Sequence, residues 1–113
     1  MSPTARSLKL LRSHGYTAEV VEHFNHYTKQ RKDLFGFVDI VAINGSGFLA
    51  IQATSASNQS SRMKKIAVEP KAAEWLLAGG RIFVHGWRKK KVKRGGKAFR
   101  YECNEIEVTQ VNS

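Results

Sequence analysis

The sequence is poor in cysteine and has no long apolar run. Cys103 is the single cysteine, which excludes an intramolecular disulfide framework and a zinc site built on several cysteines. A chain with so little cysteine is typical of a reducing, cytoplasmic compartment. No apolar run approaches the roughly 18 residues of a membrane-spanning helix, and the N-terminus lacks the pattern of a signal peptide. We therefore expect a cytoplasmic protein that does not associate with membranes.

Acidic residues are also scarce. The 113 residues include 9 Asp or Glu against 19 Lys or Arg, which gives a formal net charge of +10. No acid occurs between Glu74 and Glu102. This excess of positive charge favours a polyanionic partner, nucleic acid first, over a protein that is merely basic. The length and the hydrophobic content of 42% predict one globular domain, residues 1–113, with a single core.

Two apolar runs joined by a short polar turn occupy the middle of the sequence. The runs are Phe37–Ile43 and Phe48–Ala53, and residues 44–47, Asn-Gly-Ser-Gly, separate them. Asn-Gly and Ser-Gly pairs between β-branched apolar runs are a strong signal for a β-hairpin. Because both runs are apolar on both faces, we predict buried, central strands.

Three polar residues interrupt this hairpin: Asp39, Gln52 and Thr54. Side chains alternate along a strand, so Gln52 and Thr54 share one face. If Ile43 pairs with Phe48, Asp39 lies directly opposite Gln52, roughly 5 Å away at Cβ and close enough to share a metal ion. A two-residue Asn-Gly turn would instead leave the pair diagonal on the same face. The alternative to a metal site is a buried Asp39 satisfied by backbone N–H groups.

These residues resemble the core of the PD-(D/E)XK nuclease superfamily, in particular its phage and archaeal Holliday-junction-resolvase-like members. Val38-Asp39 matches the P-D element, Gln52 the acidic residue, Ala53 the spacer and Thr54 the lysine. Gln replaces the acid in some branches, whereas Thr in place of Lys is a departure that affects catalysis rather than the fold. The resemblance covers about half of the chain, residues 15–66.

The resemblance implies that Asp39, Gln52 and the Ala53 carbonyl hold Mg²⁺ or Mn²⁺ and that Thr54 orients the attacking water. Glu22, on a predicted strand over Tyr16–Tyr27, is a candidate for a further metal carboxylate; an ion pair with a Lys or Arg is its alternative. Asp33 is expected to cap the turn before the hairpin rather than to lie in the outer shell of the metal site. The resemblance also implies a homodimer, because a branched DNA junction requires two cuts.

Basic residues form two groups that are candidates for phosphate binding. A helix predicted from about Gln59 carries Arg62, a candidate phosphate clamp or a solvated surface residue, and also Lys64 and Lys65, either of which could replace the missing lysine. A loop at the tip of a hairpin between Trp87 and Phe99 is predicted to bind phosphates. Its basic residues are Arg88, Lys89, Lys90, Lys91, Lys93 and Arg94.

The predicted order is one helix, three strands, a helix broken at Pro70, and two strands. This order predicts an α/β fold in which helices flank a mixed central sheet, and the resemblance implies a restriction-endonuclease-like αβββαβ core. The resemblance implies a metal-dependent endonuclease that cleaves DNA, possible substrates including branched DNA, with selectivity for the structure of the DNA. The alternatives are a non-catalytic nucleic-acid-binding protein on a degenerate nuclease fold and a small basic RNA-binding structural protein.

Overall fold

The first helix has the terminal signals that its sequence predicts. In the computed structural model, which describes residues 1–111 of the chain, helix α1 spans Pro3–Ser13. The Ser2 side chain accepts a hydrogen bond of 3.1 Å from the Ala5 N–H and caps the helix. The chain then turns at Gly15, whose φ of +88° is accessible to glycine without strain.

Two further helices follow the predicted hairpin. The short 3₁₀ helix η1 (Ala56–Asn58) leads into α2 (Gln59–Ala67), and α3 (Pro70–Leu77) follows after a short break. The break falls where predicted, because a proline is tolerated at the first position of a helix but not in its interior. The Glu69 side chain accepts the Lys71 N–H at 3.3 Å and caps α3.

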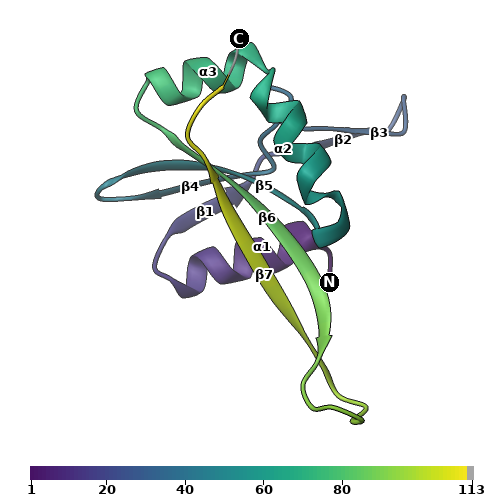
Figure 1. Ribbon diagram of the computed structural model, residues 1–113. Helices are drawn as coiled ribbons and strands as arrows, with labels where there is room; N and C mark the ends of the chain where they lie inside the picture. The colour runs from purple at the N-terminus through teal and green to yellow at the C-terminus, as the bar shows by residue number, and fades with distance from the viewer. Residues whose placement is uncertain (112–113) are drawn as a thin grey trace.

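Five strands form a mixed central sheet in the order β1-β4-β5-β6-β7 (Figure 1). Neighbouring strands are antiparallel except for β5 and β6, which are parallel and are connected through α2 and α3. A parallel pair requires such a crossover connection. The strands are β1 (Thr17–Val20), β4 (Ile40–Asn44), β5 (Gly47–Ser55), β6 (Arg81–Lys91) and β7 (Phe99–Val108).

The register of the β4–β5 hairpin is the one predicted from the four-residue turn. Ile43 pairs with Phe48, and the Asp39 N–H donates to the Ile51 carbonyl at 3.0 Å, so Asp39 lies across from Gln52. The prediction that the first strand begins at Phe37 was wrong, because the N–H groups of residues 37 and 38 bond back to Leu34 in a turn. Asp39 therefore lies just before β4, at the end of the ladder.

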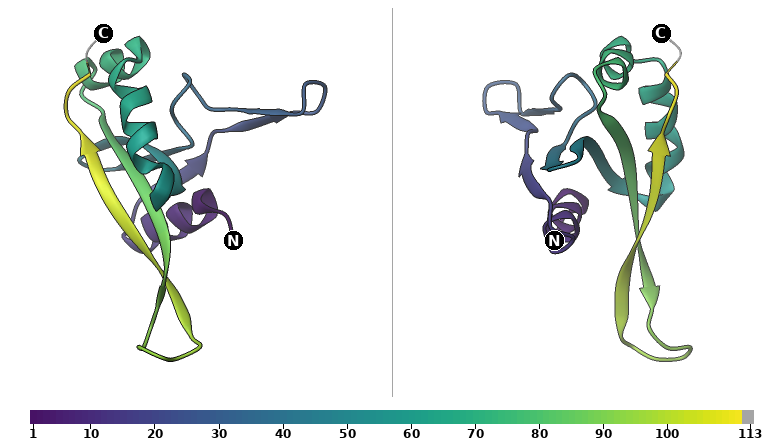
Figure 2. Two further views of the ribbon diagram at one scale, coloured as in Figure 1. Left: turned by 45° about the vertical axis from the view of Figure 1, so that its right-hand side comes forward. Right: turned by 90° about the vertical axis from the view of Figure 1, so that its left-hand side faces the viewer.

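The single strand predicted over Tyr16–Tyr27 was also wrong. The chain leaves the central sheet after Val20, and β2 (His23–Asn25) pairs with β3 (Gln30–Lys32) in a separate two-stranded sheet. This hairpin projects away from the body of the molecule (Figure 2). The alternating sequence pattern continues from β1 into β2, so it did not reveal the break between these two strands.

Helices cover both faces of the central sheet, and each face has its own core. The α1 face buries Leu11, Ala18, Ile40, Ala42, Leu49, Ile51 and Phe83. The opposite face, covered by α2 and α3, buries Phe37, Val38, Ala50, Ile66, Ala72, Ile82, Val84 and Val108. Because side chains alternate along a strand, Gln52 and Thr54 lie on the same face as Ala50, toward α2.

The β6–β7 hairpin extends beyond the sheet as a long arm (Figures 1 and 2). Residues 88–91 were predicted to lie in its loop, but they belong to β6 and pair with β7 up to Lys91 opposite Phe99. The turn is confined to residues 92–98. β7 is an edge strand of the central sheet. Within residues 1–111, none of the helices combines the length and the apolarity needed to cross a bilayer.

Candidate metal centre

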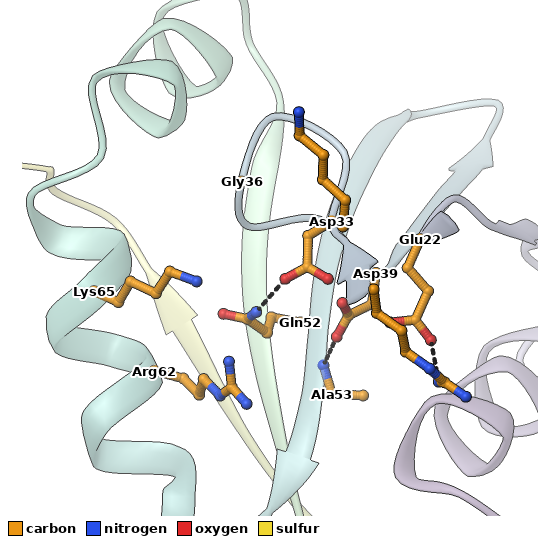
Figure 3. Close-up of a pocket in the computed structure, with 10 residues that line it drawn as sticks. Glu22, Asp33, Gly36, Asp39, Gln52, Ala53, Arg62 and Lys65 are labelled. Carbon is orange, nitrogen blue, oxygen red and sulfur yellow. Dashed lines mark hydrogen bonds and ion pairs between the residues drawn. The ribbon is translucent and has the colours of Figure 1, made fainter. Parts of the chain in front are cut away.

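A polar cavity with a volume of about 410 Å³ opens between β5, α2 and the segment that precedes β4 (Figure 3). Acidic side chains approach it from the β3–β4 side, and Arg62 and Lys65 approach it from α2. Opposite charges thus line one cavity, which suits a site for a cation and an anion together. Its lining residues are Glu22, Arg31, Lys32, Asp33, Gly36, Asp39, Gln52, Ala53, Arg62 and Lys65.

Three carboxylates from three separate segments meet in this cavity. Glu22, Asp33 and Asp39 each offer an oxygen atom, and these atoms lie within 4.8 Å of one another. Glu22 follows β1, and a hydrogen bond of 2.8 Å from the Val21 N–H to the Asp39 carbonyl holds it beside Asp39. Glu22 also accepts a bond of 3.1 Å from Arg31, so the ion pair considered as its alternative role is present as well.

Asp39 is the most deeply buried of the three acids, with 4% of its surface exposed. One carboxylate oxygen accepts the Ala53 N–H at 2.9 Å. The pKa of Asp39 is raised to about 8, mainly by burial and also by the adjacent Asp33 and Glu22 carboxylates, against the opposing effect of the Ala53 N–H. Asp39 is therefore mostly protonated at neutral pH unless a cation binds and favours the carboxylate.

Gln52 lies beside this cluster with an unsatisfied oxygen. It is 2% exposed, and its Nε2 donates to Asp33 Oδ2 at 3.1 Å. Among residues 1–111, its Oε1 is the buried side-chain polar atom without a hydrogen-bond partner, a state that costs about 1–3 kcal/mol. Figure 3 shows this oxygen on the side from which Lys65 approaches. A half-turn of the amide would offer Oε1 to an ion held by the acids.

The donor set fits a hard divalent cation. Such ions take carboxylate and carbonyl oxygens as ligands, and the cavity supplies three carboxylates and the Gln52 amide. Bringing three acids together is unfavourable without a compensating charge, and an ion would remove that repulsion. The cluster could therefore hold a metal ion.

The structure brings together most of the residues that were predicted from the sequence to form the metal site. Asp39, Gln52, Ala53 and Glu22 all line the cavity. Ala53 contacts Asp39 through its N–H. Thr54 is buried and pairs with Gly86 of β6, and it is not among the residues that line the cavity.

Asp33 and Lys65 were not clearly identified by sequence reasoning. Asp33 closes the expected turn with its carbonyl, which accepts the Gly36 N–H at 3.1 Å, while its side chain joins the carboxylate cluster. Lys65 and Lys64 were equivalent candidates by sequence, and Lys65 is the one that lines the cavity. The helical spacing of Arg62 and Lys65, three residues apart, was the available signal for Lys65.

The basic residues of the β6–β7 arm are partly neutralised. Glu102 of β7 lies 3.7 Å from Arg88 and 3.6 Å from Lys90. Lys89 lies over the Phe99 ring at 4.2 Å. Lys91 ends the strand, and Lys93 and Arg94 lie in the exposed turn. The arm therefore presents its free positive charge mainly near the tip.

A second buried polar cluster lies on the α1 face of the sheet, and sequence reasoning did not detect it. His85 contacts Ser7 Oγ through Nδ1 and Glu105 through Nε2, both at 2.8 Å. Trp87 Nε1 also donates to Ser7 Oγ at 2.8 Å. Burial lowers the pKa of His85, and Glu105 partly offsets this effect. Ser7 and His85 are fully buried, so this Ser–His–Glu arrangement is inaccessible to a substrate and is structural.

The fold and the site define an α/β protein with a five-stranded mixed sheet and an acidic cluster that could hold a metal ion. Comparison of the chain with protein-family models, with curated proteins and with solved structures gives no match.

Proposed function

We propose that the protein is a metal-dependent DNA endonuclease with a PD-(D/E)XK-type, restriction-endonuclease-like αβββαβ core. The order α1, β1, β4, β5, helices, β6 supports this fold, with an antiparallel meander followed by a parallel strand. The observation that carries the function is the cluster of three carboxylates facing Arg62 and Lys65 across one cavity.

The cavity residues divide the chemistry of phosphodiester hydrolysis between them. Glu22, Asp33 and Asp39, with Gln52 after rotation of its amide, would hold Mg²⁺ or Mn²⁺. Such an ion supplies activation of water and neutralisation of charge on the phosphate. Arg62 would bind the phosphate.

Lys65 takes the role that the superfamily pattern gives to a lysine at the position of Thr54. Lys65 projects from α2 into the cavity, so its ammonium group would offset negative charge on the phosphate. Thr54 carries no charge and does not line the cavity. The positive charge of the site would therefore come from the helix instead of from the strand.

The charge of the molecule supports DNA as the substrate. The net charge of +10 and the exposed basic tip of the β6–β7 arm favour a polyanion. Selectivity for branched DNA and a homodimer, which would make the two cuts that a junction requires, complete the proposal.

A non-catalytic nucleic-acid-binding protein on the same fold is the second candidate. The observation that favours it is the motif itself: Gln52 is neutral, and Thr54 cannot supply the charge of a lysine. In that case the basic surface would bind nucleic acid, and the acidic cavity would have no catalytic role.

A nuclease assay on branched, duplex and single-stranded DNA separates the two candidates. We expect slow cleavage, faster with Mn²⁺ than with Mg²⁺ because a softer ion tolerates the neutral Gln52 ligand more readily, and no cleavage in EDTA. Binding of DNA without metal-dependent cleavage of any form would instead support the non-catalytic candidate.

A further inference from the structure

The β2–β3 hairpin is a small sheet that lies largely outside the packed body of the molecule. All six residues of its two strands are exposed, so neither of its faces is buried in a core. An isolated two-stranded hairpin is marginally stable in water at best. Its projection from the body of the molecule is visible in both views of Figure 2. Such an element gains order when a ligand covers it.

The hairpin surface combines positive charge with exposed aromatic rings. Residues 23–32 contain no acid and include three Lys or Arg and two His. Phe24 is 47% exposed and Tyr27, at the tip, is 98% exposed. Aromatic rings interleaved with basic side chains are the composition by which proteins bind single-stranded nucleic acid, because bases stack on the rings while cations contact phosphates.

Hydrogen bonds of the turn determine how Tyr27 is presented. Asn25 Oδ1 accepts the N–H groups of Tyr27 at 2.9 Å and of Thr28 at 3.2 Å. The Asn25 carbonyl accepts the Lys29 N–H at 2.8 Å, and Lys29 adopts a left-handed φ of 58° that closes the turn. The Asn25 side chain thus fixes the backbone at the tip, and Tyr27 is exposed to solvent.

The base of the hairpin forms one wall of the candidate metal centre. Glu22 precedes β2, while Arg31 and Lys32 end β3 immediately before Asp33, and all of them line the cavity. A nucleic-acid strand whose phosphate enters the cavity would continue along this hairpin. The ring of Tyr27 would then lie beside the nucleotides that flank the reacting phosphate.

We propose that the β2–β3 hairpin binds an unpaired DNA segment next to a duplex, with bases stacked on Tyr27 and Phe24 and with Lys29 and Lys32 at the phosphates. The inference rests on the proposed function for its choice of DNA. It names the substrate class within that function: DNA in which single-stranded nucleotides adjoin a duplex, as in a flap, a fork or an open junction.

Binding measurements in EDTA test this inference without requiring cleavage. The probes are two DNAs with the same duplex, one blunt and one carrying a single-stranded extension, each titrated by fluorescence anisotropy. Tyr27→Ala should weaken binding to the extended DNA about tenfold, the loss of roughly one stacked base, and leave binding to the blunt duplex unchanged. Tyr27→Phe, which keeps the ring and loses the hydroxyl, is the matched control and should bind both DNAs like the wild type.

Lys29→Ala tests the contribution of positive charge separately from that of the aromatic ring. It removes a phosphate contact without removing a ring, so it should weaken binding to the extended DNA and flatten its salt dependence, whatever the identity of the bases. Tyr27→Ala should leave that salt dependence unchanged.

The outcomes separate this inference from the proposed function. If Tyr27→Ala binds both DNAs like the wild type, or weakens both equally, the hairpin does not recognise unpaired bases and belongs to another partner, even if metal-dependent cleavage is observed. If the extended DNA is bound through Tyr27 but no form is cleaved with Mg²⁺ or Mn²⁺, the hairpin inference holds and the nuclease proposal fails.

Discussion

Two clusters of polar side chains, each built around buried residues, lie on opposite faces of the same sheet, and they differ in how completely their atoms are satisfied. On the α1 face, Ser7, His85 and Glu105 form a continuous hydrogen-bonded chain. On the α2 face, Asp39 lies beside two other carboxylates, and Gln52 Oε1 has no partner among the described residues. The buried members of both clusters, Ser7 and His85 in the first and Asp39 and Gln52 in the second, lie in an interior that penalises uncompensated polar groups.

The difference distinguishes a cluster that stabilises the fold from one that is available for a ligand. A satisfied network has no capacity left for another group, and its removal costs stability. In the second cluster, three adjacent carboxylates and Gln52 Oε1, which has no partner within residues 1–111, lower the stability of the fold until a cation binds. The first cluster should therefore respond to mutation through folding, and the second through metal binding and activity.

The largest effect should come from Asp39→Asn in the candidate metal centre. Loss of this carboxylate should reduce metal-dependent cleavage by on the order of 10³-fold, the upper range for one electrostatic group in an active site. Folding should persist, because the Asn oxygen can still accept the Ala53 N–H. Single-turnover cleavage and circular dichroism measure the two effects. Cleavage at the wild-type rate would remove Asp39 from the site, and an unfolded variant would make it structural.

Two neighbouring lysines of α2 offer a matched pair. Lys65→Ala should lower the cleavage rate about 10²-fold if its ammonium group offsets charge on the phosphate. Lys64→Ala changes the net charge equally but affects a residue outside the cavity lining, so its rate should stay within about twofold of the wild type. Equal losses in the two variants would show that these residues contribute only to the general positive field.

The satisfied cluster should respond through stability alone. Ser7→Ala removes the acceptor of the Trp87 N–H and the partner of His85 Nδ1, so it should lower the free energy of unfolding by about 1–3 kcal/mol. Urea denaturation measures this loss. Cleavage per folded molecule should not change. A variant of wild-type stability with reduced activity would overturn the assignment of this cluster as structural.

The two clusters should also give stability a pH dependence of opposite sign. The pKa of Asp39 is raised to about 8, so between pH 4 and 8 the folded state holds a proton that the unfolded chain has lost, and stability falls as pH rises through this range. The pKa of His85 is lowered, so below its usual value of about 6.5 the unfolded chain gains a proton first, and stability falls as pH falls.

Above pH 6.5 the effect of Asp39 dominates, because His85 is mostly neutral there in both states. The free energy of unfolding should decrease toward pH 8 and level off above it. Asp39→Asn, or a saturating divalent ion, should remove that decrease. A wild-type profile that is flat between pH 6.5 and 8 without metal would show that Asp39 is not held protonated.

The part of the site that lies within one hairpin could be predicted from the sequence. A short polar turn between two apolar runs allows only a few registers, each with Asp39 and Gln52 on one face, and the observed pairing of Ile43 with Phe48 places Asp39 across from Gln52. The N-cap at Ser2 and the helix break at Pro70 were predictable for the same reason, since each signal lies within a few residues of its effect.

Features that depend on distant contacts could not be predicted. Asp33 lies 19 residues before the Gln52 side chain that it contacts, in a polar stretch without strand periodicity. His85 and Ser7 are 78 residues apart, and nothing in the alternation of β6 marks His85 as partnered. The ion pair between Arg88 and Glu102 could not be predicted from the basic run, because Glu102 lies on the other strand of the hairpin, beyond the turn.

Calorimetric titration of Mn²⁺ into the wild type and Asp39→Asn at pH 7, in two buffers of different ionisation enthalpy, tests the central claim most directly. The account predicts saturable binding to the wild type with release of close to one proton, because Asp39 with a pKa of about 8 must ionise to bind the ion. It also predicts that this binding is lost in the variant. No binding to the wild type, or equal binding to the two proteins, would contradict the assignment of the acidic cavity as a metal centre.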